Sequence, residues 1–164
     1  MNRRAASNAV PGWPVTSAKP AASMPRRARG GWMWEQAFPG SVNQVGHVRS
    51  AVRMVLDGCP AADDVVHVLS EISANACQHS RSGKPGGKFI VRLQHSPGEC
   101  VRGEVEDEGG PWGGYLAASA RDQSGLSIVL ALTSSCGVEL RPGEHHAVWF
   151  CIPCQPEYLG EAGR

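Results

Sequence analysis

The sequence has little net charge, few aromatic residues and no long apolar run, and each shortage excludes a class of function. The formal net charge is +1 over 164 residues, and the basic residues form no stripe interleaved with aromatics, as a nucleic-acid surface would require. The longest strongly apolar run, Ile128 to Leu132, is far shorter than the ~20 residues that cross a bilayer. No apolar stretch of a secretory signal follows the N-terminal arginines. We therefore expect a cytoplasmic protein with no direct contact to nucleic acid or membrane.

Paired metal-binding motifs are also scarce, although the chain has six cysteines. Cys151-x-x-Cys154 has the spacing of a zinc knuckle, and Cys136, His145 and His146 precede it. Cys151, however, falls in an alternating stretch that predicts a strand. Zinc sites usually bring two such cysteine pairs, or one pair with spaced histidines. We therefore expect inert core or surface thiols.

Composition divides the chain into three parts. Residues 1–31 are rich in Ala, Pro, Arg and Ser and lack periodicity, so they bury too little apolar surface to offset chain entropy and are expected to be a disordered arm. Residues 32–153 carry continuous helical and strand patterns and are long enough for one hydrophobic core. Residues 154–164 are expected to form an unstructured tail.

The pattern within residues 32–153 predicts an alternation of helices and hairpins. Helices are expected over 41–56, from about 62 to 82 and over 124–132, and strands over 32–38, 88–95, 100–106, 137–140 and 147–152. The glycine-rich stretch 108–123 is expected to be a mobile loop. Helices on one face of a mostly antiparallel mixed sheet give a two-layer α+β sandwich.

The most informative stretch is SEISANACQHS, from Ser70 to Ser80. Glu71 and Asn75 are four residues apart, so on a helix their side chains project from one face. The carboxylate can accept a proton, and the amide oxygen can ligate a hard cation such as Mg²⁺. Taken alone, such a pair is more often a solvated polar helix face.

Two more blocks follow this helix in the chain. The stretch VRGEVEDEGGP, from Val101, alternates and then runs into Asp-x-Gly-x-Pro, and Ser-Gly-Leu, from Ser124, opens an apolar helical run. With its three blocks in this order, the sequence resembles the histidine-kinase-like ATPase superfamily. The closest resemblance is to the small single-domain branch of bacterial anti-sigma factors and serine kinases of actinomycete type, over about Trp34 to Pro153.

The resemblance implies roles for five residues of the first two blocks. Asp107 would accept a hydrogen bond from the adenine amino group, and Gly109 would let the flat ring approach the backbone. Asn75 would ligate Mg²⁺ that bridges the ATP phosphates. Glu71 would be the catalytic general base. His79, one turn after Asn75, would lie near the phosphates or is simply a surface histidine.

Two departures from the family pattern concern the phosphates and the adenine. Gly125 and Leu126 open a helix whose N–H groups would receive phosphate oxygens, but Gln123-Ser124 stands where relatives commonly carry Gly-Arg. Ala147 stands where relatives carry a threonine that holds the adenine-bound water. Both departures predict weakened nucleotide binding or turnover.

The resemblance implies an ATP–Mg²⁺-binding regulatory protein that phosphorylates a serine of a small antagonist protein of the anti-anti-sigma type. It would alternately hold a sigma factor or another client. The resemblance is also compatible with a homodimer. The alternative is a nucleotide-binding partner-switching module with little or no catalytic activity. A third interpretation, the ATPase half of a sensor kinase, is disfavoured because no phosphoacceptor helices precede the fold.

Overall fold

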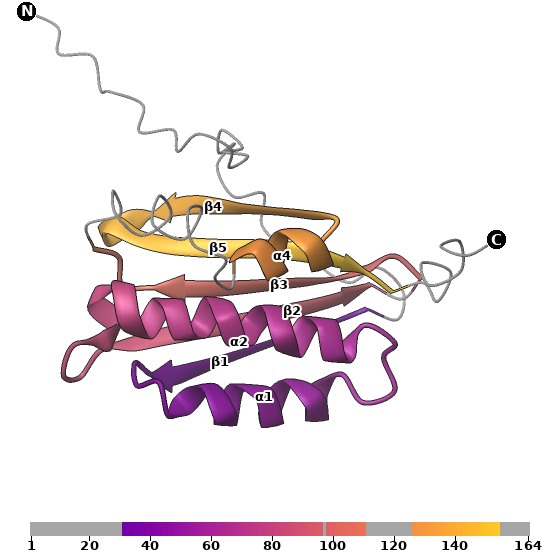
Figure 1. Ribbon diagram of the computed structural model, residues 1–164, viewed down its shortest axis with the longest axis horizontal. Helices are drawn as coiled ribbons and strands as arrows, with labels where there is room; N and C mark the ends of the chain where they lie inside the picture. Colours follow the sequence, from indigo (N-terminus) through magenta and orange to yellow (C-terminus); the bar gives the residue numbers. More distant parts are fainter. Residues whose placement is uncertain (1–30, 97, 111–125, 155–164) are drawn as a thin grey trace, which may run out of the picture.

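The computed structural model describes residues 31–96, 98–110 and 126–154. Along the chain, a strand and two helices lead into a hairpin, a further helix and a second hairpin (Figure 1). The elements are β1 (Trp32–Pro39), α1 (Gln44–Val55), α2 (Ala62–His79), η1 (Arg81–Gly83), β2 (Lys88–Ser96), β3 (Cys100–Asp107), α4 (Leu126–Leu132), β4 (Ser135–Arg141), η2 (Pro142–Glu144) and β5 (His145–Pro153). The predicted order of elements is confirmed. The arm 1–30 and most of the expected loop and tail lie outside the described residues.

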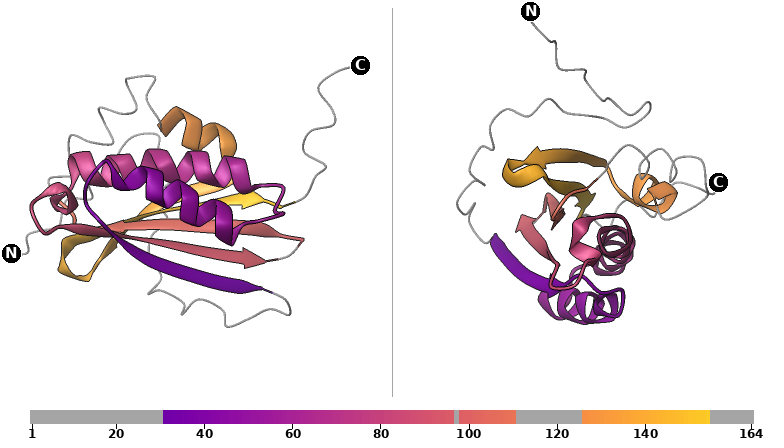
Figure 2. Two further views of the ribbon diagram at one scale, coloured as in Figure 1. Left: turned by 90° about the horizontal axis from the view of Figure 1, so that it is seen from below. Right: turned by 90° about the vertical axis from the view of Figure 1, so that its left-hand side faces the viewer.

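The strands form one five-stranded sheet in the order β1-β2-β3-β5-β4. Helices α1, α2 and α4 cover one face of this sheet, and both views in Figure 2 show the two layers. The predicted α+β sandwich is therefore confirmed. The expected mixed character is not found, because every described strand pairing is antiparallel.

The core lies between the sheet and α1 and α2, and the alternation of β2 shows why. Phe89, Val91 and Leu93 have no exposed surface, because every second residue of a strand points to the same face. The buried stripe of α2 includes the four predicted residues, Val65, Leu69, Ile72 and Ala76. Burial of each large apolar side chain contributes about 1.5–3 kcal/mol, so this layer holds α2 in place.

Gly103 of β3 shows how closely the core is packed. A Cβ at this position would lie 2.2 Å from Cζ of the Phe150 ring, and Gly103 pairs with Phe150 across β3 and β5. The ring fills the space that any other residue would need. The absence of a side chain in mid-strand is thus a packing requirement.

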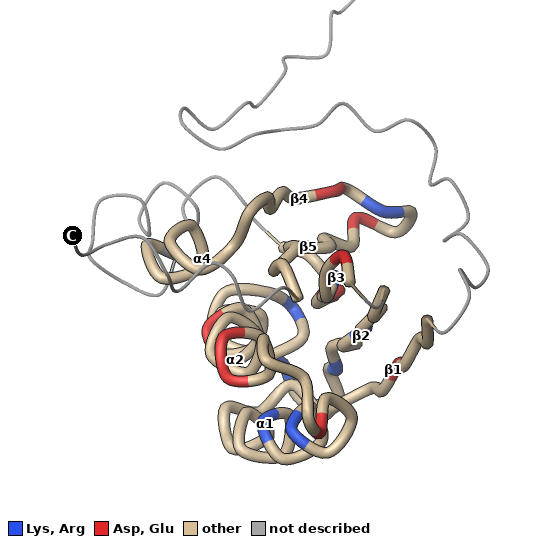
Figure 3. The backbone as a smooth tube through the Cα atoms, turned by 90° about the vertical axis from the view of Figure 1, so that its right-hand side faces the viewer, with Lys and Arg blue, Asp and Glu red and all other residues tan. Residues whose placement is uncertain are grey.

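The uncovered face of the sheet carries a network of ion pairs. Arg92 donates to Glu104 (2.8 Å) and Glu106 (2.7 Å), and Arg141 donates to Glu104 (2.8 Å). Burial raises the pKa of Glu106, but hydrogen bonds from Arg92 and His145 outweigh it and leave that pKa lowered. Figure 3 shows segments of both signs over the strands. Among the described residues, no helix has the length and apolarity of a membrane span.

Candidate functional site

Helix α2 presents Glu71 and Asn75 beside its buried stripe. Both residues are half-buried, and neither side chain makes a hydrogen bond or ion pair with another described residue. Asn75 precedes the helix end at His79 by about 6 Å along the axis, and Glu71 by about 12 Å. A carboxylate and an amide are therefore exposed side by side near the C-terminal end of α2.

The C-terminal end of α2 is tied to the end of β3 by three hydrogen bonds. The Arg81 backbone N–H donates to the Gly109 carbonyl (2.6 Å), and the Arg81 Nε–H donates to the Glu108 carbonyl (2.9 Å). In return, the Glu108 N–H donates to Ser82 Oγ (2.9 Å). Both elements end at the same edge of the domain (Figure 1). Segments that are some thirty residues apart in the chain are thereby held together.

Asp107 is the last residue of β3 and is 7% exposed. Its Oδ1 accepts a hydrogen bond from the Gly109 N–H (2.7 Å), and His146 Nδ1 lies 3.5 Å from the same oxygen. Burial raises the pKa of Asp107 to about 6, although the hydrogen bond from Gly109 and the charge of Arg81 act in the opposite direction. The carboxylate is thus ionised at pH 7 or above and can accept a hydrogen bond from a donor.

Gly109 is held in a left-handed conformation (φ +71°) against the turn between β4 and β5. A Cβ would lie 1.8 Å from the Glu144 carbonyl oxygen, and the Arg81 guanidinium also reaches the Glu144 carboxylate (3.3 Å). The resemblance predicts a glycine that admits a flat ring. The described contact instead is with Glu144, so packing of this turn alone requires glycine at this position.

The strand register decides which residue of β5 faces Asp107. Asp107 pairs with His146, whereas Ala147 pairs with Glu106. Directly opposed residues share a face of the sheet, so Ala147 lies on the uncovered face with the ion pairs. The structure therefore does not bring Ala147 to Asp107, and His146 occupies that place. Burial lowers the pKa of His146 to about 4, so its imidazole is neutral at pH 7.

The remaining predicted site residues are less well placed by the structure. Gly125 lies outside the described residues, and Leu126 is the first residue of α4. His79 ends α2 and is exposed. The loop expected over 108–123 is described only as far as Gly110.

Sequence reasoning missed Arg81, Ser82, Glu144 and His146 as parts of this site. A signal existed for His146, because counting back by two from Phe150 and Val148 places it on the helix-covered face. No comparable signal existed for Glu144, because its approach to Gly109 depends on which strands pair.

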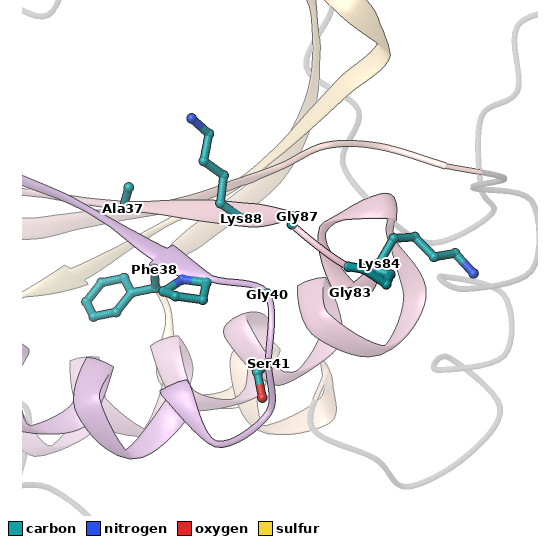
Figure 4. Close-up of a pocket in the computed structure, with 11 residues that line it drawn as sticks. Ala37, Phe38, Gly40, Ser41, Gly83, Lys84, Gly87 and Lys88 are labelled. Carbon is teal, nitrogen blue, oxygen red and sulfur yellow. The ribbon is translucent and has the colours of Figure 1, made fainter.

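A separate cleft of about 650 Å³ lies beside this site, between the end of β1 and the turn that leads into β2. Its lining includes Gly40, Ser41 and Gly83 but no carboxylate. Figure 4 shows that Lys84 and Lys88 extend away from the cleft in different directions. Since binding sites for polar ligands need convergent polar groups, we assign no ligand to this cleft.

Comparison with known proteins identifies the family. The model of a family described as the histidine kinase-like ATPase domain matches residues 38–151, well over half of the chain. The chain belongs to this family. Its members are ATPase domains, so membership implies that the chain binds ATP. No curated protein matches the chain.

A solved structure supports the fold of this ATPase domain. The crystal structure of the RsbU and RsbW domains of Rv1364c from Mycobacterium tuberculosis matches with a TM-score of 0.53 and 21% sequence identity. The match covers 73% of this chain but only 32% of that chain. At this identity the likeness concerns the fold alone, and the activity and partners of the larger protein are not transferred by it.

Proposed function

We propose that this histidine kinase-like ATPase domain binds ATP with Mg²⁺ between α2 and the end of β3, and phosphorylates a serine of a small antagonist protein. The observation that carries the proposal is the junction at Arg81. Its hydrogen bonds to Glu108 and Gly109 hold the C-terminal end of α2 against the end of β3, where Asp107 lies. Adenine recognition and phosphate chemistry would then occur at one end of the sheet.

Asp107 would select adenine by accepting a hydrogen bond from the exocyclic amine. Guanine offers a carbonyl oxygen in that place, and two acceptors repel each other. The carboxylate is rigidly held by the Gly109 N–H, so little entropy is lost when it binds the base. His146, which pairs with Asp107, would lie beside the ring or beside a bound water.

Asn75 would hold Mg²⁺. Its amide oxygen is a hard ligand, is half-buried, and has no partner among the described residues, so the donor chemistry fits a magnesium ion that keeps part of its water shell. The ion would neutralise phosphate charge during transfer. Gly125 and Leu126, which precede or open α4, are proposed to receive phosphate oxygens, with His79 at the edge of the phosphate site.

Glu71 would act as the general base. It would take the proton from the attacking serine hydroxyl as the serine oxygen bonds to the γ-phosphorus and the bond to the β-phosphate oxygen breaks, releasing ADP. A half-buried carboxylate with no ion pair among the described residues is available for this task. Phosphorylation of the antagonist would free this protein to hold a sigma factor or another client.

A second candidate function is a nucleotide-binding switch with little catalytic activity. It is favoured by one observation, the buried neutral imidazole of His146 opposite Asp107. This imidazole would occupy space beside Asp107 that an adenine-bound water would need. Ser124, in place of an arginine, would also remove one phosphate contact. Both changes would weaken nucleotide binding without affecting partner recognition.

The two functions differ in phosphate transfer. Proteins that co-purify with the chain from its native cell would be incubated with it and γ-labelled ATP–Mg²⁺. A kinase labels a partner on serine, and Glu71→Ala strongly slows the labelling but leaves the complex intact. A switch forms the same complex and gives no label with either protein.

A further inference from the structure

The opposite end of the sheet gathers two cysteines and a histidine. Cys59 lies between α1 and α2, His95 is near the end of β2, and Cys154 follows β5. Each offers one ligand atom, and these three atoms all lie within 4.8 Å of one another. They are the only such group of metal-ligating side chains among the described residues.

This grouping is distinct from the Cys-x-x-Cys pattern in the sequence. Cys151 pairs with Arg102 and so lies on the uncovered face of the sheet. His95 shares the alternation of Phe89, Val91 and Leu93 and therefore points to the helix-covered face. The partner of Cys154 is thus Cys59, from the helix layer, and Cys151 is excluded by strand geometry.

The surroundings of His95 suit a metal ligand. Its ring lies 5.5 Å from that of Trp32, which limits its orientation. Its Nδ1 is buried and has no hydrogen-bond partner among the described residues. Leaving a buried ring nitrogen without a partner is unfavourable, and a coordinated ion or a hydrogen-bonded ligand would remove that penalty.

We infer that Cys59, His95 and Cys154 form a binding site for a borderline or soft divalent cation, with zinc as the principal candidate. Tetrahedral zinc bonds of ~2.3 Å to sulfur and ~2.0 Å to nitrogen place ligand atoms about 3.5–3.8 Å apart. The three atoms therefore need to approach one another by roughly 1 Å to reach this geometry. A water molecule or another ligand completes the tetrahedron.

The ligand types determine which metal ion binds and how many protons are released on binding. Thiolate, not thiol, binds zinc, so each of the two cysteines gives up a proton when the ion binds, and affinity falls as the pH is lowered. Two thiolates and an imidazole favour zinc over magnesium or calcium, which prefer oxygen ligands. The site is therefore chemically separate from the proposed nucleotide site.

The position of the site indicates a structural role. It would join the connection between α1 and α2 to the ends of β2 and β5, three segments that are far apart in the chain. The site lies at the start of β3, whereas Asp107 ends that strand. The two ends are about 24 Å apart, so the ion would stabilise the fold without contacting the nucleotide.

The inference is tested by titrating the reduced 164-residue chain with Co²⁺ and then with Zn²⁺. We expect one tetrahedral Co²⁺ per chain, seen as visible d–d absorption with a thiolate charge-transfer band, and displacement by zinc. Cys59→Ser and Cys154→Ser should lose these bands, and His95→Gln should weaken them. Zinc should raise the unfolding temperature of the wild type but not of these variants.

Cys151→Ser is the matched control, because it removes a half-buried thiol three residues from Cys154. It should bind as the wild type does; loss of binding in this variant would overturn the assignment. If Cys154→Ser fails to fold, Cys154→His offers a second test, since a histidine ligand should preserve Co²⁺ binding with a weaker charge-transfer band. No uptake by the reduced wild type, with a Cys59–Cys154 disulfide in the isolated protein, would show a redox pair and contradict the metal site.

Discussion

The two ends of β3 carry different chemistry. At the end where Asp107 lies, β3 is tied to the residues that follow α2, and we propose that oxygen ligands of these two elements bind Mg²⁺ and an adenine amine there. The end at Cys100 lies near the thiols of Cys59 and Cys154 and the imidazole of His95, which suit zinc. The comparison teaches that one small sheet offers places for two unrelated sites, because each of its ends receives a separate set of loops and helix termini.

The largest difference between the two ends should appear in catalysis. Glu71→Ala should slow phosphate transfer to a partner serine by about 10²–10⁴-fold, since a positioned general base contributes that much. ATP affinity should change little, because Glu71 is not proposed to contact the nucleotide. The rate is measured with γ-labelled ATP and the affinity by calorimetry.

The control for this experiment is Glu99→Ala, which removes an exposed carboxylate at the opposite end of the sheet. It should leave both rate and affinity unchanged. Full phosphate transfer by Glu71→Ala would place the base elsewhere.

The contact of Gly109 with Glu144 can be compared with an open glycine of similar backbone conformation. A Cβ added at Gly98 (φ +77°) would have no atom within 4 Å, whereas a Cβ added at Gly109 would lie 1.8 Å from the Glu144 oxygen. Gly98→Ala should cost about 1–2 kcal/mol of unfolding free energy for the left-handed conformation alone. Gly109→Ala should cost clearly more, because the β4–β5 turn must move. Urea denaturation measures both, and equal costs would contradict the described contact.

The titration of Asp107 gives a smaller and pH-dependent effect. Its folded pKa of about 6 lies above the ordinary 3.8, so its contribution to stability is full below pH 3.8 and is lost as pH rises through 6. The Asp107→Asn variant does not lose this stability, because its amide side chain does not ionise. Relative to wild type, the variant should gain up to about 2–3 kcal/mol between pH 4 and pH 7.

His146 titrates in the opposite sense. Its folded pKa of about 4 lies below 6.5, so its neutral burial favours the folded state above pH 6.5, and that stability is lost as pH falls to 4. In the wild type the two titrations partly cancel. Asp107→Asn should therefore show the steeper rise of stability with pH, as followed by urea denaturation at several pH values. If the unfolding free energies of the wild type and Asp107→Asn change in parallel with pH, the raised pKa of Asp107 is ruled out.

Much of the fold, and the places of Glu71, Asn75 and Asp107 on their elements, were predictable from local patterns. The helical spacing of Glu71 and Asn75 and the alternation of β2 and β3 depend on residues a few positions apart, so the sequence displays them directly. By contrast, the pairing of Asp107 with His146, the approach of Glu144 to Gly109 and the meeting of Cys59 with Cys154 depend on strand order and register. These are long-range properties that a single sequence does not encode in any short window.

The same reasoning explains why the sequence pattern assigns Ala147 to the adenine and overlooks His146. A shift of one residue in a strand moves a side chain to the other face of the sheet. The family pattern predicts which segment of the chain lies near the adenine, but not which of its residues pairs with Asp107. Only the pairing of β3 with β5 places Ala147 with the ion pairs.

Nucleotide selectivity at the Asp107 end tests the central claim most directly. Calorimetry at pH 8, where the carboxylate is ionised, would compare ATP–Mg²⁺ and GTP–Mg²⁺ binding to the wild type, to Asp107→Asn and to Glu139→Gln, a control on the uncovered face. We predict that the wild type and Glu139→Gln prefer ATP, and that Asp107→Asn weakens ATP binding by about 1–3 kcal/mol. Equal affinity of the wild type for ATP and GTP, or an unchanged ATP affinity in Asp107→Asn, would contradict the assignment of this end of the sheet to adenine.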